Sequence, residues 1–150
     1  MGIRFSRAGC GMGGAVLVFM VALAGPSALS VLASDQTRQQ TPPEYEAKVM
    51  PSGWRDNPKA LEAGRQIYEG RLNPDIHCAV CHGTDGKPTR QGRGAPDLSD
   101  PVGTANASDG RWFWSVSEGK ARTKMPGYRD KLSEEQRWQV VAYIRSFARK

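Results

Sequence analysis

Cysteine and histidine are scarce in this chain, which has 150 residues but only three cysteines and two histidines. Cys10 lies near the amino terminus, and Cys78 and Cys81 stand close together in the middle. No thiol beyond this close pair is therefore left for a structural disulfide in the main part of the chain. Basic residues are scattered rather than clustered, although the formal net charge is +6. We expect no nucleic-acid partner, because no basic run interleaved with aromatic residues is present.

Strand patterns are also missing, and no internal repeat is visible. Three segments instead carry helix signals. Asn57-Pro58 suits the start of a helix, because Asn is a good cap and Pro fits the first position. The segment from Ser108 to Glu118 is apolar on one side and precedes Gly119, a residue that often ends helices. Ser133-Glu134-Glu135-Gln136 has the form of a capping box. The sequence predicts an all-α fold of about three main helices joined by irregular loops.

Residues 1–33 have the pattern of an export signal. Arg4 and Arg7 precede an apolar run, and the first acidic residue is Asp35. Cleavage after Ala33 is expected, with Ala24 as a second candidate site. The alternative is that residues 15–33 stay in place as a membrane anchor, since this segment is close to the roughly 20 residues needed to span a bilayer. Both interpretations place the rest of the chain outside the cytoplasm.

The remaining chain is expected to consist of two parts. Residues 34–57 form a polar, proline-rich extension, which predicts a linker or a flexible arm. Its second half has enough apolar content to lie over the surface of the domain that follows, although nothing in the sequence fixes the position of Met50. The domain itself is expected at residues 58–150.

The motif Cys78-Ala79-Val80-Cys81-His82 predicts covalent attachment of one haem c. The spacing lets the Cys78 and Cys81 thiols add to the two vinyl groups, and it places His82 beneath the iron as an axial ligand. A CxxC pair also suits a zinc half-site or a redox-active dithiol. Zinc would need further ligands, and His77 is the only other histidine. A dithiol of the thioredoxin kind would need a βαβ setting, which is not visible.

The second axial position of the iron requires another ligand, and past residue 33 the methionines are Met50 and Met125. Met125 precedes Pro126-Gly127, which favour an irregular loop that can direct the thioether inward. We therefore expect Met125 to bind the iron, with filling of a core gap as the alternative role. A His/Met pair raises the reduction potential and closes both axial positions. Such an iron suits electron transfer rather than oxygen or peroxide chemistry.

From about residue 58 onward, the sequence resembles the class I c-type cytochromes. The resemblance rests on the attachment motif and on residues that occur in the family's order: Gly64, Tyr68, Gly83, Met125-Pro126, Trp138 and Tyr143. It implies the cytochrome c fold, with helices and loops wrapped around one covalently bound haem. It also implies that the carbonyl of Pro96 accepts a hydrogen bond from His82, that Leu98 packs against the haem, and that Tyr143 lies where the first and last helices cross.

These observations predict an exported monohaem electron carrier that is not itself an enzyme. Its expected partners are redox proteins in the periplasm, such as a dehydrogenase, an oxidase or a reductase. Lys87, Arg90 and Arg93 are candidates for steering an acidic partner. One alternative is a haem subunit of a larger oxidoreductase, anchored to the membrane by residues 15–33 or tightly bound. Another is a haem sensor or peroxidase, which would require that Met125 does not hold the iron.

Overall fold

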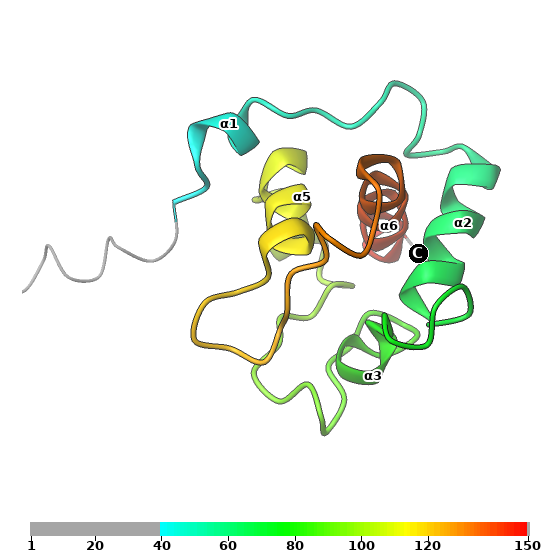
Figure 1. Cartoon of the computed structure of the whole chain (residues 1–150), viewed down its shortest axis with the longest axis vertical. Coiled ribbons are helices and arrows are strands. Elements are labelled where there is room, and N and C mark those ends of the chain that lie inside the picture. The colour runs from blue at the N-terminus through cyan, green and yellow to red at the C-terminus, as the bar shows by residue number, and fades with distance from the viewer. Residues whose placement is uncertain (1–39, 150) are drawn as a thin grey trace, which may run out of the picture. The chain divides into compact units, whose positions relative to one another are not determined.

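The computed structural model describes residues 40–149, which form the helical unit shown in Figure 1. The predicted signal segment and the alternative anchor lie outside the described residues. Between residues 40 and 149, no helix is both long enough and apolar enough to cross a membrane. The same range contains no strand, which confirms the all-α prediction. Its helices are α1 (Pro43–Glu46), α2 (Pro58–Tyr68), α3 (Ala79–His82), α4 (Pro101–Ala105), α5 (Asp109–Glu118) and α6 (Glu134–Phe147).

The three longest helices begin where their capping residues predict. The side chain of Asn57 accepts hydrogen bonds from the backbone N–H groups of Lys59 and Ala60 at the start of α2. Ser108 caps α5 in the same way, and α5 ends at Gly119. At α6, Ser133 and Gln136 form both hydrogen bonds of the capping box. These caps satisfy backbone donors that have no partner within the helix.

The core lies where α2, α5 and α6 pack together, and Figure 1 shows α6 between the other two. Helix α2 crosses α6 at Gly64, where no side chain separates the two backbones. The Tyr68 and Tyr143 rings meet at this crossing, with their centroids 5.4 Å apart. The predicted role of Tyr143 at the crossing is therefore confirmed.

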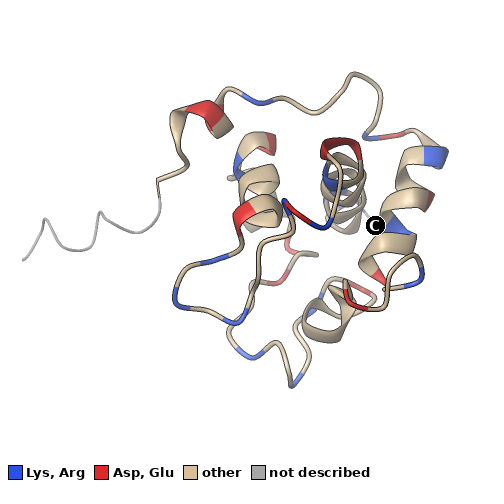
Figure 2. Cartoon of the chain, in the orientation of Figure 1, with Lys and Arg blue, Asp and Glu red and all other residues tan. Residues whose placement is uncertain are grey.

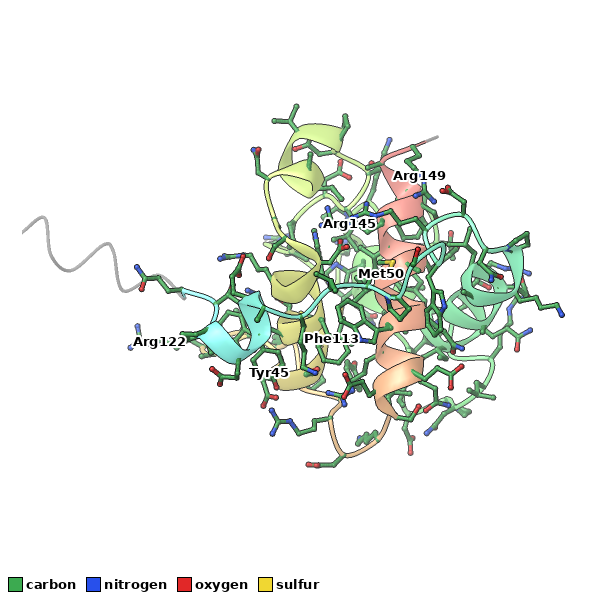
Figure 3. All side chains as sticks on the ribbon, turned by 90° about the horizontal axis from the view of Figure 1, so that it is seen from above. Tyr45, Met50, Phe113, Arg122, Arg145 and Arg149 are labelled. Atoms are coloured by element: carbon green, nitrogen blue, oxygen red, sulfur yellow. The ribbon has the colours of Figure 1, made fainter. Side chains whose placement is uncertain are left out.

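Residues 43–57, called the strap from here on, pack against the domain. The strap begins with α1 and crosses above α5 and α6 before α2 starts (Figure 1). Its backbone touches α5 at Gly110, where a Cβ atom would stand 2.0 Å from the carbonyl oxygen of Tyr45. Met50 is only 9% exposed and belongs to the core, so the expectation that nothing fixes its position was wrong. Figure 3 shows Met50 beneath the strap, close to α6.

A buried arginine joins the end of α6 to α4 and α5. Arg145 is 7% exposed, and its guanidinium donates to Asp109 and to the carbonyl oxygens of Thr104 and Ala107. Asp109 also pairs with Arg55 of the strap at 2.8 Å. The structure thus gives Arg145 a long-range role that joins segments far apart in the sequence.

Candidate haem site

The attachment motif forms the short helix α3, which follows Cys78 directly. The backbone N–H groups of Cys81 and His82 both donate to the carbonyl oxygen of Cys78, at 3.1 and 2.9 Å. This single turn brings the two cysteines and the histidine into one compact group. Gly83, with φ +67°, ends the turn in a conformation that glycine adopts easily. The hydroxyl of Tyr68 in α2 donates to the Gly83 carbonyl at 2.8 Å and thereby ties the motif to the core.

The loop after the motif folds back against it. The Thr89 N–H donates to the carbonyl of Cys81 at 2.9 Å. Gly92 then passes so close that a Cβ atom would stand 1.9 Å from the same carbonyl oxygen. Only a glycine fits such an approach of backbone to backbone. The irregular loop is therefore held by the motif itself, as well as by a hydrogen bond from Leu98 N–H to Gly86 at 2.8 Å.

An apolar cavity opens beside the motif and encloses about 560 Å³ of empty space, part of it open to solvent. Five of the six predicted site residues line it, namely Cys78, His82, Pro96, Leu98 and Met125. Cys81 is half-buried but is not part of the lining. Residues from three helices and from the loop after α5 complete the walls: Tyr68, Trp112, Ser115, Val116, Lys120, Tyr128, Val140 and Ile144.

The protonation states of the motif suit haem attachment better than thiolate chemistry. Burial lowers the pKa of His82, so its imidazole is neutral at pH 7 and keeps a lone pair for a metal. Burial, together with the nearby Cys81, raises the pKa of Cys78 to about 11. A zinc site or a reactive dithiol would require a thiolate. Within residues 40–149, no group of three or more His, Cys, Asp or Glu residues could hold a metal ion.

Met125 lies in an irregular loop, residues 119–128, called the Met125 loop. The N–H of Lys120 donates to the Met125 carbonyl at 3.1 Å, and the Met125 N–H donates to the Thr123 hydroxyl at 3.1 Å. Gly119 permits this closure, because a Cβ atom there would stand 2.5 Å from the Met125 carbonyl. The backbone around Met125 is therefore held on both sides while its side chain reaches the cavity.

Two buried nitrogen atoms at the cavity have no hydrogen-bond partner among the described residues. They are Nδ1 of His82 and Nε1 of Trp112, and both residues belong to the lining. The bond from His82 to the Pro96 carbonyl, which the resemblance implied, is therefore not formed. Pro96 is exposed and lines the cavity from a loop. Two backbone hydrogen bonds hold this loop in shape, from Ala95 N–H to the Gly92 carbonyl and from Leu98 N–H to the Gly86 carbonyl.

This cavity fits the haem that the sequence predicts. Its walls are mostly apolar, as a porphyrin requires, and the Cys78 thiol, the His82 imidazole and the Met125 thioether belong to the residues that line it. The Trp112 indole N–H, which has no partner among residues 40–149, gives the site a donor for a carboxylate. Trp112 was not predicted as a site residue, because an indole at helical spacing gives no signal that separates lining a cavity from filling a core.

Comparison with known proteins identifies the family of this chain. Residues 59–144 match the family described as cytochrome c oxidase, cbb3-type, subunit III. The protein is therefore an all-α c-type cytochrome domain with covalently bound haem c, and it belongs to this family. A solved structure, the KustC0563 c-type cytochrome, is 32% identical over 56% of this chain and 95% of its own, with a TM-score of 0.49. A domain of this class carries electrons.

Proposed function

We propose that this protein carries single electrons between redox proteins, with the haem iron held between His82 and Met125. The observation that carries the proposal is that Met125, which is distant in the sequence, lines the same cavity as Cys78 and His82 of the attachment motif. When bound, haem c supplies an iron that accepts and releases one electron. A methionine in the second axial position favours the reduced iron and leaves no site for oxygen or peroxide.

Each part of the chain has a separate task in this proposal. Cys78 and Cys81 hold the haem through thioether bonds, and the neutral imidazole of His82 supplies one axial ligand. The thioether of Met125 supplies the other. Leu98, which is fully buried in the cavity wall, helps to exclude water and thereby keeps the surroundings of the iron apolar. Trp112 Nε1 is placed to donate to a carboxylate of the haem.

Charge around the cavity supports a redox partner with an acidic surface. Lys87, Arg90 and Arg93 are exposed on the loop that follows α3, and Arg122 and Lys124 are exposed on the Met125 loop. Figure 2 shows both groups of basic residues on neighbouring loops. We propose brief, salt-sensitive encounters with dehydrogenases, oxidases or reductases, because complementary charge chiefly speeds association. The proposed location is the periplasm, on the basis of the sequence of residues 1–33.

A second candidate is a haem subunit that stays in a larger oxidase complex. The description of the matched family, subunit III of a cbb3-type oxidase, favours it. In that case residues 15–33 would remain as the anchor. Fractionation of the native cells separates the two candidates. Recovery of the haem protein in the soluble periplasmic fraction supports the carrier, whereas recovery in washed membranes together with a catalytic subunit supports the oxidase complex.

The optical spectrum of the ferric protein tests the axial ligands. Methionine bound to ferric haem iron gives a weak near-infrared band. We expect this band in the natural protein and in Met50→Leu, which changes the other methionine conservatively, but not in Met125→Ala. A natural protein without the band contradicts Met125 ligation. Rapid binding of carbon monoxide to its ferrous form would then favour a haem sensor or peroxidase.

A further inference from the structure

The Met125 loop leaves the helical core and returns to it at almost the same place. It follows Glu118, the last residue of α5, and it ends before Arg129. Three backbone hydrogen bonds close its base, each with an N···O distance of 3.0 Å. The Tyr128 N–H donates to the carbonyls of Val116 and Ser117, and the Arg129 N–H donates to the Ser117 carbonyl. Met125 lies within the segment that these bonds close.

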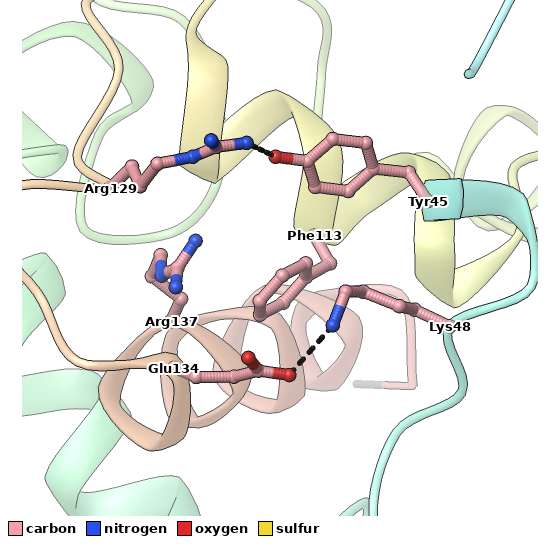
Figure 4. Close-up of a pocket in the computed structure, with 6 residues that line it drawn as sticks. All are labelled: Tyr45, Lys48, Phe113, Arg129, Glu134 and Arg137. Atoms are coloured by element: carbon pink, nitrogen blue, oxygen red, sulfur yellow. Dashed lines mark hydrogen bonds and ion pairs between the residues drawn. The ribbon is translucent and has the colours of Figure 1, made fainter. Parts of the chain in front are cut away.

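A side chain from the strap bridges the two ends of the loop. The Tyr45 hydroxyl donates to Oε1 of Glu118 and accepts a hydrogen bond from Nη2 of Arg129, and Figure 4 shows the contact with Arg129. Glu118 and Arg129 also form an ion pair with each other. The Arg129 guanidinium lies over the Tyr45 ring, 5.8 Å from its centroid. Three side chains thus close the loop from outside the cavity.

Tyr45 is well suited to hold this position. It is 6% exposed, its ring lies 6.2 Å from that of Phe113, and its carbonyl rests on Gly110 of α5. Burial raises the pKa of Tyr45, and the hydrogen bond to Glu118 adds to this effect. The phenol therefore stays protonated, which it must do in order to donate to Glu118 while it accepts from Arg129.

We propose that Tyr45 is a positioning residue for Met125: by joining Glu118 to Arg129, it keeps the Met125 loop closed and the thioether on the iron. The inference rests on the proposed function, because it requires Met125 as a ligand. Removal of the hydroxyl leaves the cavity walls unchanged but weakens the closure of the loop. The fraction of molecules in which Met125 has left the iron should then rise.

The strap offers a matched control for this proposal. Nζ of Lys48 pairs with Glu134 of α6 at 2.8 Å, as Figure 4 also shows. This contact attaches the same strap to the same domain, but it does not touch the Met125 loop. Lys48→Gln therefore loosens the strap alone, whereas Tyr45→Phe loosens the strap and the loop together. A difference in imidazole affinity between the two variants therefore measures the effect of loop closure, separately from the attachment of the strap.

The test is a titration of the ferric, haem-loaded protein with imidazole, followed by loss of the near-infrared band. Imidazole can bind only where Met125 has left, so its apparent affinity rises in proportion to the open fraction. Loss of hydrogen bonds to charged groups predicts an affinity about tenfold higher in Tyr45→Phe. For Lys48→Gln, we expect an affinity within about twofold of the natural protein, as for an exposed ion pair.

Each outcome decides between the possible roles. Equal shifts in Tyr45→Phe and Lys48→Gln, or no shift in either, would overturn the proposal and leave Tyr45 a structural role alone. Absence of the methionine band in the natural protein would overturn the proposed function first, and this inference with it. If Tyr45→Phe does not fold, Arg129→Gln removes the same contact from its exposed side. If Tyr45→Phe and Arg129→Gln both fold, the variant that carries both changes should shift the imidazole affinity no more than either single variant, since the two residues act as one unit.

Discussion

Gly64 of α2 lies so close to Gln139 of α6 that a Cβ atom on the glycine would stand 2.1 Å from the Gln139 carbonyl oxygen. The obstacle is helix backbone, so the two helices would have to move apart to admit a side chain. We expect Gly64→Ala to lower the free energy of unfolding by about 2 kcal/mol or more, measured by denaturant titration. Gln66→Ala, at an exposed position of the same helix, should change it by less than about 0.5 kcal/mol. Equal stability of the two variants would contradict this crossing.

Tyr68→Phe tests the link between α2 and the attachment motif. The change removes the donor to the buried carbonyl of Gly83, which directly follows His82. An unsatisfied buried acceptor should lower the free energy of unfolding of the haem-loaded protein by about 1–3 kcal/mol. Tyr143→Phe is the control, because it removes a hydroxyl from the neighbouring ring without touching Gly83. A larger loss in the control would show that the Tyr68 bond contributes little.

Arg145→Gln should be the most destabilising change in the network at the end of α6. The substitution removes the buried partner of Asp109 and leaves the Thr104 and Ala107 carbonyls without their donor. We expect the free energy of unfolding, measured by thermal or denaturant titration, to fall by about 3 kcal/mol. This value is at the lower end for a broken buried ion pair, because Arg55 still pairs with Asp109. Arg149→Gln, which breaks an exposed pair with Asp56, should cost less than about 1 kcal/mol.

The contact between the strap and α6 should depend on pH. The hydrogen bond from Lys48 lowers the pKa of Glu134 below its ordinary value of 4.5. A carboxyl with a lowered pKa in the folded state stabilises the protein above the unfolded pKa and loses this effect as the pH falls through the folded pKa. Glu134→Gln should therefore reduce stability by about 0.2–1 kcal/mol at pH 7, but hardly at all near pH 3. Denaturant titrations at both pH values check this, and an unchanged difference at low pH would contradict it.

Local chemistry explains why much of the structure could be predicted. The starts of α2 and α6 depend on Asn57 and on the Ser133 capping box, which act within a few residues of the chain. The attachment motif is local as well. Met125 could be predicted as the second axial ligand because the only methionines after residue 33 are Met50 and Met125. For the caps and the attachment motif, a short stretch of sequence contains both the residue and the reason for its role.

The contacts that sequence reasoning missed join distant segments. Tyr45 forms hydrogen bonds with Glu118 and Arg129, which are far away in the sequence, and the proline-rich stretch around Tyr45 contains no pattern that predicts these partners. Burial of Met50 and Arg145 likewise depends on what the fold brings against them. The short helices α3 and α4 were missed because they are single turns without an amphipathic period. Trp112 gave no sequence signal for the site, yet it lines the cavity and its indole nitrogen has no hydrogen-bond partner among the described residues.

The strap extends the folded domain beyond the segment that matches the family. The segment common to the family runs from residue 59 to 144, yet Tyr45, Met50 and Phe147 are core residues outside it. A fragment cut at the family boundaries would keep the attachment motif and Met125, but its interior would be open along α5 and at the end of α6. The segment that matches the family is thus smaller than the unit that folds, because residues on both sides of it complete the core.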